Sequence, residues 1–571
     1  MSRASLEKTH ADLEVVDNEK IAQAQLKLEH LYTKWEAAKL YPRACIYIAI
    51  MVWAMITVGY ENQAGGIVIS IPTFRKDFGH AYKEEYVLDG NWQSAISGGP
   101  YAAFVFGSFI SSALIDRVGR KYLVWVAVAL TFAFIGIEYA ATSIKVFFIG
   151  KFLNAICLGV IQTLGASYIA ELTPLALRGI ATTCANLAMC VGPFVCTIIT
   201  NETAGRLDRS AYRAIFCSQW AFAGSTIVFF WFLPESPYHF ALKNNDEKAL
   251  RCLRKIYTQP GMPEAQLQII KANIEEARTL AAAGSYKELV DKKNRKRTMV
   301  AISAFVFQPM VGLAYVSSYQ TYYYQLAGFN VHRSFQISVG AQALSVSGTI
   351  VSFFIVDRFG RRFVAISGMI TLGILNVFTA ALSIPKAHSY VTGAAAFLTM
   401  YNFFYNSGIG SISYVINTEV PTSSLRAKAV SVGVCINYSL MCMWSFVLPY
   451  MVNPDQLNMG GTINFIFAGC CVAALLFFYL YLPETSGRSY DEIDEMYKAG
   501  VPPRKWKEYK TISTGGATGD SNSTAESNEI ESTGKVEVTY VERIWNSDTE
   551  TSLFTRKWLI NVISRTQQAY V

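Results

Sequence analysis

The sequence predicts an all-α membrane protein whose twelve transmembrane helices form two six-helix halves. Three observations support this fold class: the composition, the spacing of long apolar runs, and a repeat of short phrases. Of the 571 residues, 52% are hydrophobic and only 16% are charged, whereas about a quarter of the residues in a soluble chain are charged. The charges gather in the first 43 residues, in the stretch 234–297 and beyond residue 483.

The apolar runs between these charged stretches are long enough to cross a bilayer, which requires about 20 mostly apolar residues. The expected spans are 44–67, 92–114, 122–141, 146–168, 179–200, 213–233, 298–326, 334–356, 363–384, 391–416, 428–451 and 461–482. They divide the chain into an N-terminal segment (1–43), a first half (44–233), a central loop (234–297), a second half (298–482) and a tail (483–571).

Short phrases occur twice in the chain, in the same order and each at the end of an apolar run. The repeated phrases are Asp116–Lys121 (DRVGRK) with Asp357–Arg362 (DRFGRR), Glu171 and Arg178 with Glu419 and Arg426, and Pro234–Ser236 (PES) with Pro483–Thr485 (PET). The repeated unit is therefore a block of membrane helices. Many secondary transporters build a midplane binding site between two such blocks, so the repeat predicts a carrier of small solutes.

The distribution of lysine and arginine predicts the orientation. Inner segments before the tail hold about three times as many of these residues as outer loops, which places both termini in the cytoplasm. The net charge of +8 is then explained by this bias, and no nucleic-acid partner is expected. The eleven cysteines are scattered without metal-ligand spacing. No nucleophile–base pair stands out either, so we expect no metal, no cofactor and no enzyme activity.

The segments outside the apolar runs carry weaker signals. The central loop contains helical patterns at about 246–258 and 263–282. Beyond Tyr509 the tail has too few apolar residues to fold, so we expect it to be disordered. Asn201-Glu202-Thr203 is a possible glycosylation sequon in an expected outer loop close to the membrane.

The two basic turns suggest a gate at the cytoplasmic face. Gly119 and Gly360 permit sharp reversals of the backbone, and the basic residues beside them can pair with the carboxylates of Glu171 and Glu419. The predicted gate residues are Asp116, Arg117, Arg120, Glu171 and Arg178, and in the second copy Asp357, Arg358, Arg361, Glu419 and Arg426. The alternative is that the turns only anchor the topology at the anionic leaflet.

At these residues the chain resembles the major facilitator superfamily, in particular its sugar porter branch. The resemblance covers about residues 43–510 and rests on the paired turns, Pro234–Pro237 (PESP), Tyr168–Glu171 (YIAE) before Arg178-Gly179, and Pro483–Thr485 with Gly487-Arg488. It narrows to fungal α-glucoside (maltose-type) permeases at Tyr41–Arg43 (YPR), Tyr319–Tyr324 (YQTYYY) and Val501–Lys505 (VPPRK).

The resemblance implies a sugar site at the midplane, lined by the fifth, seventh, eighth, tenth and eleventh spans. Its polar contacts carry over to Asn186, Gln308, Ser345, Tyr414, Asn437 and Tyr438. From the residues alone, Asn186, Gln308 and Asn437 are amides in apolar runs, and each must face a partner or a cavity. A hydrogen bond between helices would satisfy them as well as a sugar would.

Some positions depart from the sugar porter pattern. Pro309 and Ala314 replace a glutamine and an asparagine of the seventh span, and Glu61 replaces an aspartate of the first. These departures argue against a plain hexose as the substrate and leave the fold unchanged. Three hypotheses are open. The first is proton symport of a sugar, such as an α-glucoside or another oligosaccharide, by a monomer in a fungal plasma membrane. The others are a carrier of a non-sugar, such as a secondary metabolite or an organic acid, and a nutrient sensor that does not transport.

Glu61 is the residue that most suggests coupling to protons. Together with Glu138 and Lys151, it is one of three charged residues that lie within the expected spans rather than at the first residue of a span. A carboxylate inside a bundle costs several kcal/mol unless it is paired or protonated. Glu61 is therefore the predicted proton carrier, and a purely structural ion pair with Lys151 is the alternative.

Overall fold

The structure is a computed structural model, and most of the chain between residues 34 and 509 is described. The described residues are 34–82, 85–174, 177–257, 261–283, 286–292, 294–385, 387–422, 425–486, 488, 490–506 and 509. The expected disorder of the tail lies outside these residues, as does most of the N-terminal segment.

Six long helices form the first half. They are α3 (Pro42–Ile67), α5 (Gly90–Val118), α6 (Arg120–Ala140), α7 (Ile144–Leu172), α8 (Arg178–Thr203) and α9 (Ser210–Phe232). Helices α5 and α6 follow each other with only Gly119 between them. This residue has a φ of 101°, a conformation that glycine adopts without steric cost.

The second half contains six long helical segments, two of which are interrupted. Its helices are α13 (Arg295–Gln308), α14 (Ala314–Leu326), α15 (Val331–Phe359), α16 (Arg361–Leu382), α17 (His388–Ser407), α18 (Ile409–Glu419), α19 (Arg426–Val452) and α20 (Asn464–Tyr481). Eleven segments of the described chain are long and apolar enough to cross a membrane, counting α13 to α14 as one. Helices α17 and α18 together occupy the expected tenth span.

Both interruptions differ from the continuous helices that the apolar runs predict. A π-helical turn, Pro309–Leu313, joins α13 to α14, and Gly312 within it has a φ of 107°. Proline offers no backbone N–H, and glycine tolerates the positive φ, so the helix changes course here. Between α17 and α18, Gly408 leaves helical geometry with a ψ of −113°.

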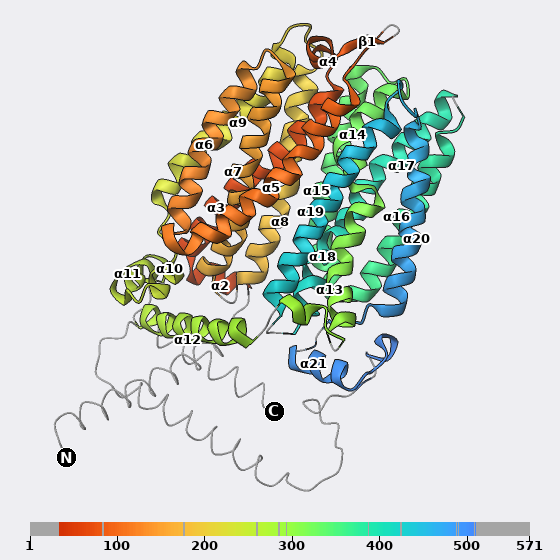
Figure 1. The fold of residues 1–571 in the computed structure, drawn as a ribbon. Helices are drawn as coiled ribbons and strands as arrows, with labels where there is room; N and C mark the ends of the chain where they lie inside the picture. Colours follow the sequence, from red (N-terminus) through yellow and green to blue (C-terminus); the bar gives the residue numbers. More distant parts are fainter. Residues whose placement is uncertain are drawn as a thin grey trace, which may run out of the picture. The chain divides into compact units, whose positions relative to one another are not determined.

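Short elements cover the two ends of the bundle (Figure 1). At one end lie α4 (Pro72–Phe78) and a hairpin of β1 (His80–Tyr82) and β2 (Glu85–Val87), paired antiparallel with His80 opposite Val87. We call this the hairpin end.

At the other end, the short-helix end, lie α2 (Lys34–Leu40), α10 (Pro237–Leu242), α11 (Asp246–Ile256), α12 (Met262–Ala283) and α21 (Tyr490–Lys498). Helices α11 and α12 confirm the two helical patterns of the central loop. Short 3-10 turns occur at Val68–Ser70, Tyr286–Leu289, Gly460–Ile463 and Pro503–Lys505.

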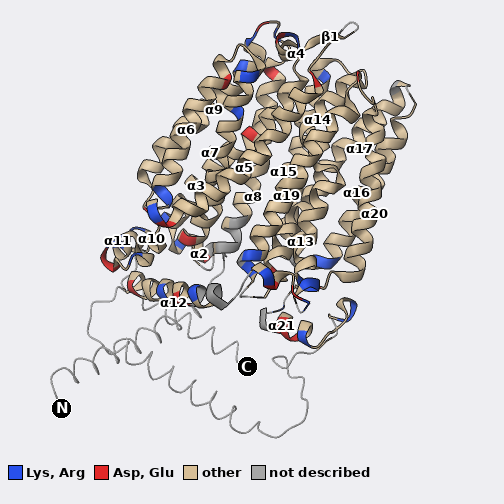
Figure 2. Cartoon of the chain, in the orientation of Figure 1, with Lys and Arg blue, Asp and Glu red and all other residues tan. Residues whose placement is uncertain are grey.

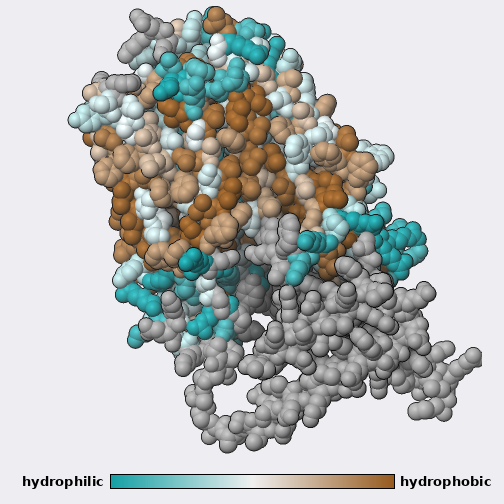
Figure 3. All heavy atoms as spheres, turned by 180° about the vertical axis from the view of Figure 1, so that it is seen from behind, coloured by the Kyte–Doolittle hydropathy of each residue, from teal (hydrophilic) through white to brown (hydrophobic). Residues whose placement is uncertain are grey.

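The buried apolar residues form two large clusters, which correspond to the two halves. One cluster draws almost entirely on α2 to α12, and the other on α13 to α20. The halves meet where α5 packs against α19, α8 against α15, and α14 against α3. Lysine, arginine, aspartate and glutamate gather at the two ends of the bundle (Figure 2), and an apolar belt lies between the ends on the surface seen from behind (Figure 3). This is the surface expected of a protein embedded in a bilayer.

Candidate functional site

A buried ion pair joins α3 and α7 in the first half. The ammonium of Lys151 donates to Glu61 Oε1, and Gln219 of α9 donates its amide N–H to Glu61 Oε2. Glu61 is 4% exposed and Lys151 is 1% exposed. Gly65 makes room for the lysine, because a Cβ at this position would lie 2.6 Å from Lys151 Cε. The pair that we considered as a structural alternative is therefore present.

A second carboxyl lies against the same turn of α7. Glu138 of α6 is 1% exposed, and its Oε1 accepts a hydrogen bond of 3.0 Å from Asn154 Nδ2. A Cβ on Gly150, the neighbour of Lys151, would lie 3.1 Å from Glu138 Cγ. Among the described residues, neither Glu138 Oε2 nor Asn154 Oδ1 has a hydrogen-bond partner.

A small cavity of about 10 Å³ connects the ion pair to the other half, which is room for about one water molecule. Glu61, Lys151 and Asn62 line it from the first half, and Ser318 of α14 lines it from the second. The proton-binding candidate therefore lies at the boundary between the two halves.

Two of the three predicted amides meet in the second half. Asn437 Nδ2 of α19 donates to Gln308 Oε1 of α13 over 3.0 Å, and to the carbonyl of Phe305 over 3.0 Å. Gln308 and Asn437 are both half-buried. Asn186 of α8 is half-buried as well, but no hydrogen bond between it and these two amides is found among the described residues.

Of the remaining predicted ligands, Ser345 and Tyr438 lie on helices that pack against the first half, and Tyr414 lies on α18 within the second half. Ser345 Oγ of α15 accepts a hydrogen bond of 2.9 Å from Asn406 Nδ2 of α17. Tyr438 of α19 stacks on Phe104 of α5, with the ring centroids 5.9 Å apart. Tyr414 of α18 is 48% exposed and touches the edge of Phe305.

Sequence reasoning missed Asn406, which contacts both halves. Besides donating to Ser345, it accepts a contact of 3.6 Å from Cys190 Sγ of α8 through its Oδ1. Cys190 also lies 3.2 Å from the hydroxyl of Thr349 on α15. The signal that pointed to Asn437 was available here too, because Asn406 is an amide inside an apolar run.

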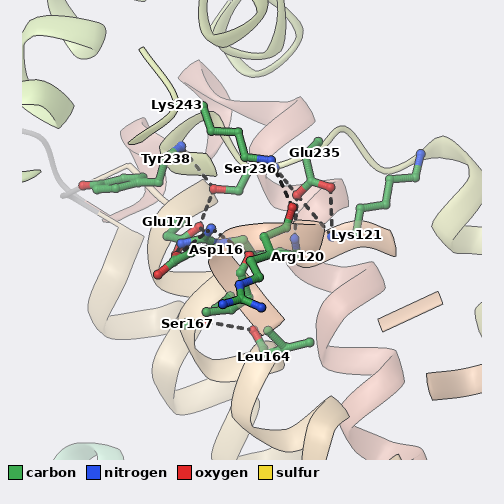
Figure 4. A network of polar contacts seen from close by, with 12 residues as sticks. Asp116, Arg120, Lys121, Leu164, Ser167, Glu171, Glu235, Ser236, Tyr238 and Lys243 are labelled. Atoms are coloured by element: carbon green, nitrogen blue, oxygen red, sulfur yellow. Dashed lines mark hydrogen bonds and ion pairs between the residues drawn. The ribbon is translucent and has the colours of Figure 1, made fainter. Parts of the chain in front are cut away.

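At the short-helix end of the first half, Arg120 and Glu171 form the centre of a polar network (Figure 4). Arg120 Nε lies 3.1 Å from Glu171 Oε2, and Ser236 donates its hydroxyl to the same carboxylate. The carboxylate of Glu235 accepts the backbone N–H groups of Arg120 and Lys121 over 2.9 Å and 3.1 Å. Glu235 thus caps the start of α6, where helix N–H groups have no partner within the helix.

The second half repeats this network at the equivalent place. Arg361 Nη2 lies 3.1 Å from Glu419 Oε1, and Thr485 donates to Glu419 Oε2 over 2.6 Å. Glu484 accepts the backbone N–H groups of Arg361 and Arg362 over 2.8 Å and 3.1 Å. Sequence analysis noted the phrases that contain Glu235 and Glu484 but assigned them no role.

Each of the two carboxylate–arginine pairs joins residues of a single half, one pair in each half. Among the described residues, Glu171 binds Arg120 and Ser236, and Glu419 binds Arg361 and Thr485, so neither carboxylate contacts a membrane helix of the other half. They therefore do not tie the halves together in this conformation, which differs from the simplest form of the expected gate. Arg120 and Arg361 are the first residues of α6 and α16. Each reaches a neighbouring helix of its own half, because the tight turn before it fixes its position.

The other predicted gate residues are peripheral to these pairs. Asp116 Oδ1 lies 3.6 Å from Arg120 Nη1, and the side chain of Asp116 is largely exposed. Arg117 is exposed, and its carbonyl accepts a hydrogen bond from Lys243. Arg358 is exposed. Arg426 lies at the start of α19 and is half-buried. The side chains of Arg178 and Asp357 are outside the described part.

His239 of α10 lies beside the network of the first half. It is 5% exposed, and a Cβ on Gly119 would lie 3.3 Å from its Nε2 and 2.8 Å from Glu235 Oε2. Burial lowers the pKa of His239 below its ordinary value of 6.5, and the neighbouring Glu235 carboxylate opposes this shift. A neutral imidazole thus fits beside the arginines of the turn.

At the hairpin end, polar groups do cross between the halves. Arg75 Nη2 of α4 donates to Gln325 Oε1 of α14 over 3.0 Å, and Gln325 Nε2 donates to the carbonyl of Ser70 over 2.7 Å. Ser94 of α5 donates to the carbonyl of Phe446 on α19 over 2.9 Å. The halves are thus in direct contact at this end.

Asn201 is not in a loop, which corrects the expectation for the sequon. Helix α8 continues to Thr203, and the Asn201 amide donates to Glu202 Oε1 over 2.9 Å within the last helical turn. The apolar run ends at Thr200, but the helical hydrogen bonds continue for one more turn beyond it.

Comparison with known proteins agrees with this architecture. A sequence model of the family described as "Sugar (and other) transporter" matches residues 46–497. The chain belongs to the sugar (and other) transporter family. The resemblance to major facilitator sugar porters that the motifs predicted is thereby confirmed.

Relatives of this family in Saccharomyces cerevisiae match over most of their length. A maltose permease is 28% identical over 485 residues, which are 83% of this chain and 79% of the permease. A general alpha-glucoside permease is 29% identical over 490 residues, which are 84% of this chain and 79% of that protein. The predicted likeness to α-glucoside permeases is confirmed at the level of sequence.

Solved structures of the same fold include the xylose transporter of Escherichia coli. Its inward open conformation superimposes with a TM-score of 0.66 at 19% identity, covering 79% of this chain and 98% of that one. A proton:xylose symporter structure with a bound bromodeoxyglucose gives a TM-score of 0.63 at 18% identity and covers 80% of this chain and 99% of that one. These matches confirm the all-α major facilitator fold.

Proposed function

We propose that this protein is a secondary active transporter that moves an α-glucoside or another oligosaccharide together with a proton by alternating access. The observation that carries the proposal is the buried Glu61–Lys151 pair beside a cavity lined by both halves. Protonation of Glu61 would release Lys151 and change the contacts at the boundary where the halves must move. The names of the yeast relatives, a maltose permease and an alpha-glucoside permease, support the substrate class.

The driving force is sufficient for uphill uptake. One proton that crosses about 100 mV and about one pH unit supplies roughly 3.7 kcal/mol. This concentrates a neutral solute by about 400-fold at most, since each 1.4 kcal/mol corresponds to a factor of ten.

The sugar contacts are proposed for Gln308, Asn437, Ser345 and Asn406, because their amides and hydroxyl form hydrogen bonds between the helices of the second half. Tyr438 and Phe104 would supply aromatic surface from both halves. Asn186 and Tyr414 stay in the proposed site on the strength of the family resemblance alone.

The two polar networks at the short-helix end are proposed to act in gating by fixing the helix ends of each half while the halves rock. Neutralising Arg120 or Glu171 should raise labelling of cysteines that face this end. Unchanged labelling would remove the gate role and leave topology anchoring.

We also propose that the protein works as a monomer in the plasma membrane, with the short-helix end in the cytoplasm.

Uptake of a panel of labelled solutes tests the proposal. Cells that lack their own sugar carriers should accumulate maltose or a related α-glucoside when they express this protein, and a protonophore should abolish accumulation. Uptake of organic acids instead of sugars would favour the second hypothesis, to which the loss of amides at Pro309 and Ala314 points. Binding without uptake of any solute would favour a sensor.

A further inference from the structure

The buried charges around Lys151 do not balance if both nearby carboxyls are ionised. Lys151 interacts electrostatically with Glu61 and with Glu138, and all three side chains are almost fully buried. One ammonium between two carboxylates would leave a net negative charge away from water, which is costly. One of the two carboxyls must therefore carry a proton.

The hydrogen bonds assign this proton to Glu138. Glu61 uses both oxygens to accept from Lys151 and Gln219, as an ionised carboxylate does. Glu138 accepts only one hydrogen bond, from Asn154 Nδ2, and its second oxygen has no partner among the described residues.

Asn154, the residue that donates to Glu138, also has a side-chain atom without a partner. Asn154 Oδ1 is an acceptor without a donor in the part of the chain that the structure describes. A protonated carboxyl and a primary amide can pair through two hydrogen bonds, with the O–H donating to the amide oxygen. A proton on Glu138 Oε2 would thus satisfy both atoms at once.

We propose that Glu138 is a second protonation site of the transporter, which holds a proton with Asn154 in this conformation and exchanges with Glu61 as the partner of Lys151. This step rests on the proposed function. In it, the O–H bond at Glu138 breaks and one at Glu61 forms, while Lys151 remains an ammonium and moves its ion pair from Glu61 to Glu138. The total charge of the cluster stays the same, so neither state leaves an uncompensated buried charge.

Other titratable groups around the cluster do not replace Glu138 in this role. Cys196 of α8 and Tyr60 of α3 interact with Glu61, but both are neutral acids in their ordinary state. From α9 the cluster receives the uncharged Gln219. Within the described part of the chain, Glu61 and Glu138 are thus the two carboxyls between which Lys151 can alternate.

Infrared difference spectroscopy of the purified full-length protein in lipid bilayers tests the proposal without substrate. Wild type should show the carbonyl band of a buried protonated carboxyl at neutral pH, and Glu138→Gln should lose it. Glu61→Gln should lose it as well, because Lys151 then takes Glu138 as its anionic partner and the proton leaves. Glu202→Gln, the same substitution at an exposed position near the hairpin end, should keep the band and serves as the control.

Two results would overturn the inference. A band that persists in Glu138→Gln would show that the proton is not on Glu138. A band that is lost in Glu138→Gln but persists in Glu61→Gln would show that Glu138 stays protonated and does not exchange with Glu61 as the partner of Lys151. Neither result depends on transport, so a failure of proton-coupled uptake in wild type would contradict the proposed function separately. With coupling intact in wild type, Glu138→Gln should lose accumulation of substrate.

Discussion

Arg120 binds Glu171 inside the first half with an N–O distance of 3.1 Å, and Arg361 binds Glu419 at the same distance inside the second half. The duplicated sequence is therefore a duplicated contact. Because each pair connects helices of its own half, it strengthens that half and does not by itself hold the two halves together.

Double-mutant cycles should show that each arginine is coupled energetically to the glutamate of its own half. Arg120→Gln and Glu171→Gln should interact by about 0.5–3 kcal/mol in thermal unfolding, as residues in contact do. Arg120→Gln and Glu419→Gln should be additive within about 0.5 kcal/mol, because the two residues share no partner in the described contacts. A large coupling energy between Arg120 and Glu419 would contradict the separation of the networks.

Glu235 and Glu484 should be important for stability although neither pairs with an arginine side chain in the described contacts. Each accepts two backbone N–H groups at the start of a helix. Replacing either by glutamine turns part of the acceptor into a donor and should cost about 1–3 kcal/mol. The matched substitution Glu264→Gln, in a half-exposed ion pair with Arg254, should cost less than about 1 kcal/mol. Equal melting temperatures for all three variants would rule out the capping role.

Asn437 should contribute to affinity for the substrate. Asn437→Ala removes one hydrogen-bonding group from the proposed sugar site and should raise the KM for the transported sugar by about tenfold. Ser439→Ala, on an exposed part of the same helix, should leave KM unchanged. If both variants transport like wild type, then Asn437 only holds α13 and α19 together.

His239 should make stability depend on pH. Burial lowers its pKa in the folded protein below 6.5. As the pH falls through this value, the unfolded chain therefore binds more protons than the folded protein does. Stability should therefore decrease as the pH falls below about 6.5 and should be restored at higher pH. The melting temperature of His239→Gln should change less over this range than that of wild type. Parallel curves for the two proteins would show that His239 does not contribute.

The helices and the arginine–glutamate contacts could be predicted from sequence because they depend on local patterns. Apolar runs mark the spans, and the repeated phrases place Arg120 near Glu171 and Arg361 near Glu419. The breaks at Gly312 and Gly408 were not predicted, because a glycine in an apolar run does not reveal its backbone angles. The capping by Glu235 was missed for a similar reason: its partners are backbone N–H groups, which every residue except proline carries.

The candidate site was predictable in part. An amide in an apolar run must find a partner, and this led to Gln308 and Asn437, which do meet. It did not reveal which partner, and the same reasoning was not extended to Asn406 or Asn154. The Glu61–Lys151 contact was considered as a structural alternative. Its relation to Glu138 depends on how α6 packs on α7, which the sequence pattern does not specify.

Accumulation by Glu61→Gln tests the central claim most directly. Wild type should concentrate a labelled α-glucoside above the external level in a manner sensitive to a protonophore. Glu61→Gln, which mimics the protonated form, should only equilibrate the sugar while still exchanging it in counterflow, because exchange needs no net movement of protons. If Glu61→Gln still concentrates the sugar and still responds to the protonophore, Glu61 is structural and the account of coupling is wrong.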